Sequence, residues 1–405
     1  MKYNNKNNLN ISSFFKNQRY VFLIYFPLFI SAINIISNFF EKIVYGNRMP
    51  FADFSIYRCA AITFSEKISP YFPNALSECL NSYPHALDFF YPPITLNFFS
   101  LFAKITEINS VIIWGIIILP IFCLKIFLSH KLFMKKENIL IFIMIYLFSF
   151  GGLNYTGLLT GNISILFYTF LGISLYHLII NNNAKYFFIV LTLMCLFKIT
   201  YLSYFFLLFF LEKKNFYKYS LISLLTIFII YIFSYHSNQN LFLEFFNQLK
   251  YIRSDKFFEL YGGGFGMYSI LNELPNIFIS NINNHYFIQI AWFTICFVFL
   301  CATFFLFLNN KNLSKLQTSV IGILVITVCY PVLKDYEGLL LIPCIYYLLF
   351  NLNLKNVFLN KDNLIRYSII FLTFAIHDKY MLFFISILLF FYINYLNFKK
   401  IKIFK

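Results

Sequence analysis

Long apolar runs recur along the whole sequence, and they constrain its fold more than any other feature. Val21–Phe40 and Tyr286–Leu308 are two of the longest. Each reaches the ~20 residues that a helix needs to cross the hydrocarbon core of a bilayer. Because lipid cannot satisfy backbone N–H and C=O groups, runs of this kind form helices that bond internally. The sequence therefore predicts an all-α, polytopic transmembrane protein.

The composition supports a single membrane domain over 1–405. Only 12% of the residues are charged and 60% are hydrophobic, whereas soluble domains carry roughly 25% charged residues. The first apolar run lacks the small-residue cleavage site of a signal peptide, and many similar runs follow it. We therefore predict that the first run is a retained helix.

Basic residues orient the predicted helices, because Lys and Arg concentrate in cytoplasmic loops. The N-terminal segment carries Lys2, Lys6, Lys16 and Arg19 with no acid, so it is predicted to be cytoplasmic. Placing the later lysine clusters on the same side gives about twelve crossings with both termini cytoplasmic. The predicted spans are 20–40, 110–128, 139–152, 162–180, two arms within 185–213, 219–235, 286–308, 317–331, 338–352, 365–376 and 380–398.

The net charge of +16 could indicate a nucleic-acid partner, but the topology already explains it. Of the 16 Asp and Glu residues, only Glu137, Glu212 and Asp362 fall on the cytoplasmic side. The excess of positive charge is therefore predicted to lie on the cytoplasmic side of the membrane. We predict no nucleic-acid partner.

Two segments are too short or too polar for ordinary spans. The first, 91–104, must stay within an external loop over 41–109, as a short interfacial or re-entrant helix. The second, 185–213, has lysines at both ends, so the chain must go out and return within it. Each arm has about 12 residues, or ~18 Å of helix, against a hydrocarbon core of ~30 Å. The junction at Lys198 must therefore open into a hydrated cavity.

This topology gathers polar residues on the external side, and each has two interpretations. Lys198 either snorkels to the headgroups or contacts a phosphate. Asp53 is either a solvated or helix-capping residue or a carboxylate aimed into a cavity. The acidic and basic residues of 334–337 resemble an exposed charged turn. Two further regions are a long external loop at 236–285 and C-terminal helices with a basic tail at 351–405.

The eight cysteines predict no metal site, since no CxxC or Cys/His cluster is present. Six lie in apolar segments, where they are predicted to pack. Cys59 and Cys79 share the loop 41–109, and a disulfide and two free thiols are both open. No cofactor is predicted.

Several motifs follow one another in a recognisable order. The segment Asp53-Phe54-Ser55-Ile56-Tyr57 is followed by Ser69-Pro70-Tyr71 and then by Tyr91-Pro92-Pro93. Later come Gly161-Asn162-Ile163-Ser164, Lys198-Ile199 and Pro331-Val332-Leu333-Lys334-Asp335-Tyr336. Over 20–350 this order resembles glycosyltransferase family 87, of the GT-C class of membrane glycosyltransferases. Asn162 stands where the family has Gln, and Ile199 where it has Pro.

The resemblance implies a GT-C-like fold and an inverting transfer of a hexose, mannose-like, from a polyprenyl-phosphate sugar. The acceptor would be a lipid-linked molecule or a glycan, at the external face of the inner or plasma membrane, among membrane lipids. Asp53 would be the general base. Donor phosphate would contact Lys198, Arg58 and Lys334. Substrate would contact Tyr57, Tyr91, Asn162, Asp335 and Tyr336.

A transporter or flippase for lipid-linked glycans or small molecules is the main alternative, because broken helices and intramembrane charge also mark transporters. Such folds usually carry internal repeats, and the two halves of this sequence have no clear repeat of hydropathy.

Overall fold

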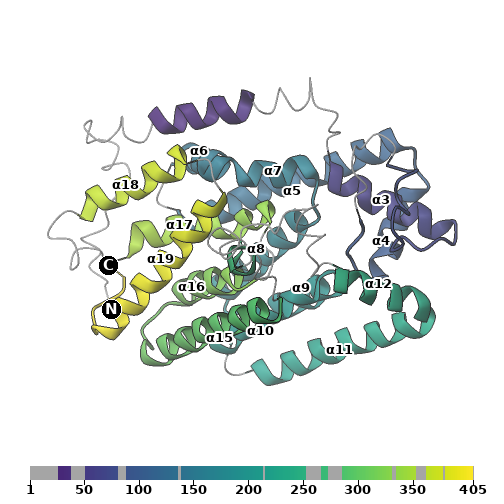
Figure 1. Ribbon diagram of the computed structural model, residues 1–405. Helices are drawn as coiled ribbons and strands as arrows, with labels where there is room; N and C mark the ends of the chain where they lie inside the picture. Colours follow the sequence, from purple (N-terminus) through teal and green to yellow (C-terminus); the bar gives the residue numbers. More distant parts are fainter. Residues whose placement is uncertain are drawn as a thin grey trace.

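The computed structural model describes residues 26–37, 51–80, 88–135, 138–212, 215–251, 266–271, 285–330, 334–352, 362–376 and 379–404. Within these ranges the chain forms helices and no strand, apart from one isolated bridge between Leu352 and Phe404. Figure 1 shows the helices gathered into one bundle. The prediction of an all-α protein is confirmed.

Four helices of the described part are long and apolar enough to cross a membrane. Their outward faces carry exposed Leu, Ile and Phe side chains, for example Leu221, Phe228 and Phe233. Apolar surface on this scale is unusual for a soluble monomer and suits contact with lipid. The four helices are α5 Glu107–Phe133, α11 Phe216–Ser237, α15 His285–Asn309 and α19 Lys379–Phe398.

The remaining described helices are shorter, and the prediction of about twelve crossings stays a prediction. They include the helix Phe26–Ser37, α6 Ile139–Phe148, η1 Ser149–Gly151, α7 Leu153–Thr160, α12 Gln239–Tyr251, η3 Asp335–Glu337 and α18 Asp362–Ala375. The predicted external loop 236–285 thus contains a helix, α12, and its parts 252–265 and 272–284 lie outside the described residues.

Three apolar helices form the centre of the bundle: α8 Ser164–Ile180, α16 Lys315–Val328 and α17 Gly338–Asn351. They are apolar on every side, so burial is their stable arrangement. From Thr318 to Val328, every residue of α16 is buried. Gly322 faces the Leu207 side chain of α10 Tyr204–Leu211, which a Cβ at this position would displace.

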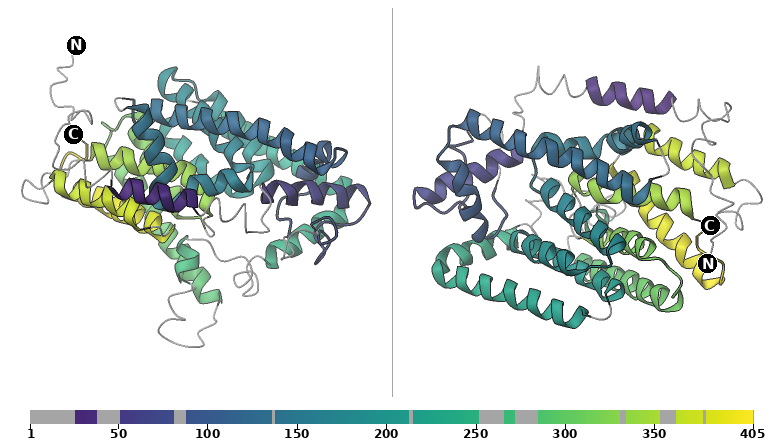
Figure 2. Two further views of the ribbon diagram at one scale, coloured as in Figure 1. Left: turned by 90° about the horizontal axis from the view of Figure 1, so that it is seen from above. Right: turned by 180° about the vertical axis from the view of Figure 1, so that it is seen from behind.

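The helices give the molecule two distinct ends. α5 and α8 run parallel, since Trp114 Nε1 donates to the Gly161 carbonyl at 2.9 Å near their starts. Near their C-terminal ends, the Lys131 ammonium lies 4.8 Å from the centroid of the Tyr176 ring. In Figures 1 and 2, the helices within 51–103 and α12 lie together at the opposite end from the C-terminus.

The end of the bundle that holds the C-terminal ends of α5 and α8 also holds the turn after α8 and the start of α16. Asn182 accepts a hydrogen bond there from the Lys315 ammonium. α17 returns to the same end, where Leu352 forms its bridge with Phe404 of the basic tail. Lysines that the sequence assigns to the cytoplasm therefore gather at one end of the bundle.

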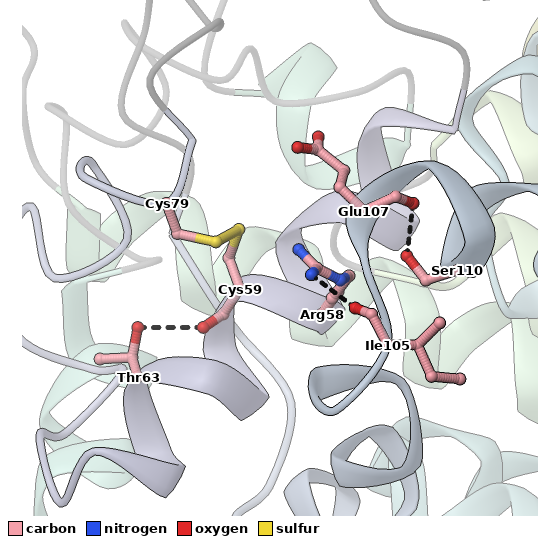
Figure 3. Close-up of a disulfide and its surroundings, with 7 residues drawn as sticks. All are labelled: Arg58, Cys59, Thr63, Cys79, Ile105, Glu107 and Ser110. Carbon is pink, nitrogen blue, oxygen red and sulfur yellow. Dashed lines mark hydrogen bonds between the residues drawn. A yellow bond between two sulfur atoms is a disulfide. The ribbon is translucent and has the colours of Figure 1, made fainter.

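The predicted external loop 41–109 contains two packed helices, α3 Ala52–Ser65 and α4 Ile94–Ala103. The predicted helix at 91–104 is confirmed as α4; its ten residues measure ~15 Å, too short to span a bilayer. Of the two open alternatives for Cys59 and Cys79, the structure has the disulfide (Figure 3). The disulfide links α3 to the turns that follow it.

The predicted break at Lys198 is confirmed. α9 Lys185–Phe197 ends there, Lys198 is extended with φ −149° and ψ 105°, and η2 Ile199–Ser203 leads into α10. The side chain of Lys198 is therefore free to leave the helix axis at the end of the bundle that holds α3.

Candidate functional site

The Asp53 carboxylate lies in the first turn of α3 and is held by Asn162. Asn162 Nδ2 donates to Asp53 Oδ2 at 2.7 Å. The amide oxygen of Asn162 accepts from the Ser164 backbone N–H at 2.8 Å, which caps the start of α8. One buried side chain therefore joins the first turns of two helices that lie far apart in the sequence.

Close backbone packing makes this contact feasible. Phe51, just before α3, has a left-handed conformation with φ 65°, and its N–H donates to the Leu159 carbonyl at 2.7 Å. Gly161 also has a φ of 65°, and a Cβ there would lie 2.8 Å from Phe51 Cβ. Glycine tolerates this conformation without steric cost, so Gly161 is required for the approach of α3 to α8.

Two tyrosines lie beside Asp53. Tyr57 follows it by one helical turn, and its hydroxyl lies 3.1 Å from the hydroxyl of Tyr91. Tyr71 donates to the Tyr91 carbonyl at 2.6 Å and so fixes the Tyr91 backbone. Burial raises the pKa of both Tyr57 and Tyr91, and the nearby Asp53 charge adds to the rise. Both phenols therefore stay neutral and keep a proton to donate.

The second part of the site is a buried ion pair. Lys198 Nζ lies 3.5 Å from Glu337 Oε1, and Glu337 is completely buried at the start of α17. Tyr168 of α8 donates its hydroxyl proton to Glu337 Oε2. The Lys198 side chain is 31% exposed, so the two partners differ in their burial.

Aromatic rings surround the Lys198 ammonium. The centroids of Tyr201, Tyr330 and Tyr336 lie 5.8, 5.9 and 5.9 Å from Nζ. At these distances the ring faces attract a cation. Lys334 is close enough to act electrostatically on Lys198, which adds a second positive charge.

The two parts of the site adjoin each other. Tyr57 interacts electrostatically with Tyr336, and Tyr91 with Tyr201. Tyr201 in turn donates to the Tyr168 hydroxyl at 3.4 Å. Tyrosine side chains therefore connect a carboxylate that can accept a proton with an ammonium that can bind an anion.

The structure thus brings together most of the predicted site residues. Asp53, Asn162, Tyr57 and Tyr91 form one group, and Lys198, Lys334 and Tyr336 form the other. The Asp335 backbone lies in η3, and its side chain is outside the described part of the structure. Snorkelling and a phosphate contact were both open for Lys198, and in this structure its ammonium forms an ion pair with Glu337.

Arg58 points elsewhere. Its guanidinium donates from Nη2 to the Ile105 carbonyl at 2.8 Å, in the turn between α4 and α5 (Figure 3). In this structure Arg58 therefore fixes α3 to the start of α5. Its role as a phosphate ligand stays a prediction.

Sequence reasoning missed the role of Glu337 and the participation of Tyr168 and Tyr201. The residues of 334–337 resembled an exposed turn, but Glu337 is fully buried. One signal was available: an acid directly before an apolar helix is costly unless it is paired, and Lys198 was an isolated cation in another apolar segment. Tyr168 gave no such signal among 31 tyrosines.

Within the described ranges, no group of three or more His, Cys, Asp or Glu side chains lies together as a metal site would require. Comparison of the chain with protein-family models, with curated proteins and with solved structures gives no match.

Proposed function

We propose that the protein is an inverting membrane glycosyltransferase that moves a hexose from a polyprenyl-phosphate sugar to a lipid-linked or glycan acceptor. The observation that carries this proposal is the pairing of two unlike groups that tyrosine side chains connect. On one side Asp53 is held by Asn162 at 2.7 Å. On the other, the partly exposed Lys198 side chain lies near Lys334.

Each group has one task in this reaction. Asp53 accepts the proton of the acceptor hydroxyl as its oxygen attacks the anomeric carbon of the donor sugar. A new C–O bond forms while the bond from the anomeric carbon to the phosphate oxygen breaks on the opposite face, which inverts the configuration. The polyprenyl phosphate leaves with the bonding electron pair. Lys198 stabilises its negative charge, and this stabilisation is strongest where water is scarce.

The tyrosines suit a sugar that lies between these groups. Tyr57 and Tyr91 keep their phenolic protons because burial raises the pKa of each. Tyr57 is buried, whereas Tyr91 is only partly buried and can offer its phenol and its ring to a sugar. Tyr336 offers a further ring next to the Lys198 ammonium.

Two features support a site at the non-cytoplasmic face of the inner or plasma membrane. The Cys59–Cys79 disulfide joins α3, which carries Asp53, to the turns that follow it. Disulfides persist in oxidising compartments outside the cytosol. Lys315 lies at the opposite end of the bundle from Asp53, beside Asn182. Such segregation of lysines agrees with the positive-inside rule.

A transfer assay tests the proposal. The purified protein in lipid nanodiscs is offered radiolabelled polyprenyl-phosphate sugars with membrane-lipid acceptors. We expect wild type to form labelled product and Asp53→Asn to lose almost all transfer while remaining folded. Glu66→Gln, an exposed acid at the end of α3, is the matched control and keeps full transfer. Undiminished transfer by Asp53→Asn would refute its assignment as base.

A further inference from the structure

The Lys198–Glu337 pair has features that a purely structural ion pair lacks. A charge-assisted N–H···O bond measures ~2.7–2.9 Å, whereas Lys198 Nζ and Glu337 Oε1 are 3.5 Å apart. Oε1 is buried without a hydrogen bond in the described structure, while Oε2 receives the Tyr168 hydroxyl. The carboxylate is thus fixed on one side and only loosely engaged on the other.

The two partners also differ in their freedom to move. Glu337 is 0% exposed and is anchored at the start of α17. Lys198 is 31% exposed and lies at a helix break. Its flexible four-carbon stem lets the ammonium change position without any change in the helices. The ammonium is therefore the mobile member of the pair.

We propose that Glu337 is an internal substitute for the donor phosphate, which occupies Lys198 in the empty site and yields it when a prenyl phosphate binds. This inference rests on the proposed function for the identity of the ligand. The Lys198 ammonium moves from Oε1 to a phosphate oxygen, and the second charge on Lys334 favours the incoming anion. Glu337 keeps its hydrogen bond from Tyr168 throughout.

The exchange solves an electrostatic problem. A partly buried ammonium without a counter-charge is destabilising, so the empty site needs an anion near Lys198. A tightly bonded carboxylate would stabilise the empty site but would exclude the substrate. A loosely held carboxylate stabilises the empty site and still lets the substrate bind. It lowers the affinity for phosphate, and a substitution of the carboxylate can reveal this effect.

Ligand-dependent thermal unfolding of the full chain in nanodiscs tests this inference. The probes are farnesyl phosphate, farnesol as the phosphate-free control, and inorganic phosphate as the lipid-free control. For Glu337→Gln we expect a lower melting temperature without ligand. We also expect farnesyl phosphate to bind about tenfold more tightly, a change equivalent to ~1.4 kcal/mol. Glu66→Gln should match wild type in both respects.

A second pair of variants guards against loss of folding. Lys198→Met should abolish the preference for farnesyl phosphate over farnesol. Lys198→Met combined with Glu337→Gln should recover stability relative to Lys198→Met alone, because the buried carboxylate no longer lacks a partner. Unchanged or weaker farnesyl phosphate binding by Glu337→Gln would overturn the inference.

The two proposals fail in different ways. If Glu337→Gln binds farnesyl phosphate more tightly but wild type transfers no sugar, the exchange stands and the proposed function fails. If wild type transfers sugar but Glu337→Gln binds no more tightly, the exchange alone fails. Stronger binding of inorganic phosphate than of farnesyl phosphate would reassign the ligand to a free anion and overturn the lipid part of the inference.

Discussion

Asn162 connects the chemistry to the fold through a single amide. Its nitrogen donates to Asp53 and its oxygen caps α8. An amide can do both because it carries a donor and an acceptor at once. A carboxylate at this position would lose the donor, and a side chain without a polar end would lose both contacts.

Substitutions of Asn162 should therefore separate the two functions. Asn162→Ala removes both contacts, so we expect a loss of about 1 kcal/mol in the free energy of unfolding, as for other N-caps, together with reduced transfer. Asn162→Asp keeps a good capping oxygen but places a second carboxylate against Asp53. We expect Asn162→Asp to lose transfer and to retain most of its stability.

Denaturant unfolding and the nanodisc transfer assay measure the two effects. Near-normal transfer by Asn162→Asp would contradict the hydrogen bond between Asn162 and Asp53 as a functional contact.

At this scale, much of the candidate site could be predicted from the sequence. Asp53 and Lys198 stand out because they are charged residues in apolar surroundings, whereas Tyr57 and Tyr91 came from the order of motifs. Glu337 did not, because only the fold reveals that a short polar stretch buries its last residue completely. The partners of Asp53 were also beyond the sequence, since Asn162 lies 109 residues away.

At the scale of elements, the approach of α3 to α8 depends on the absence of a side chain at Gly161. We expect Gly161→Ala to lower the melting temperature and to impair transfer. Its left-handed backbone costs ~1–2 kcal/mol with a Cβ, and that Cβ would lie 2.8 Å from Phe51 Cβ.

Gly172→Ala, inside α8, is the matched control. A Cβ there meets Lys125 Nζ at 3.6 Å, an ordinary contact, and alanine is favoured over glycine inside a helix. Thermal unfolding should therefore show no loss for Gly172→Ala. Equal stability of the two variants would contradict a special role for Gly161.

The disulfide is the second determinant of α3. Replacing both Cys59 and Cys79 by Ala removes a cross-link between residues 20 apart, which we expect to cost about 3 kcal/mol. The melting temperature should fall, and a reducing agent should lower that of wild type to the same value. If the reducing agent leaves the melting temperature of wild type unchanged, and mass spectrometry finds Cys59 and Cys79 as free thiols, the disulfide does not form.

Helix positions followed from apolar patterning, while their packing did not. The short helix at 91–104 and the break at Lys198 were predictable, because both are needed if all the basic clusters lie on one side of the membrane. The burial of α16 and α17 on every side was not. Apolar patterns cannot distinguish a helix that faces lipid from one that faces other helices, because both environments are apolar.

At the scale of the whole molecule, the two ends of the bundle should face opposite sides of the membrane. We expect a cysteine at Glu66, near the Asp53 end, to react with a membrane-impermeant maleimide in intact cells. A cysteine at Lys311, near the Lys315 end, should react only after permeabilisation.

Both residues are exposed, so reactivity reports the side of the membrane rather than burial. The six cysteines outside the disulfide are replaced by Ala in this experiment to remove background labelling. Labelling of both positions in intact cells would contradict the proposed sidedness.

The most direct test of the account is the fate of the donor lipid. Nanodiscs containing the protein, a polyprenyl-phosphate sugar and membrane-lipid acceptors are analysed by mass spectrometry for free polyprenyl phosphate and glycosylated product. We predict that wild type forms one molecule of polyprenyl phosphate for each sugar transferred, and that Asp53→Asn forms neither. Recovery of the intact donor from wild type, whichever donor is offered, would contradict a transferase and favour a transporter.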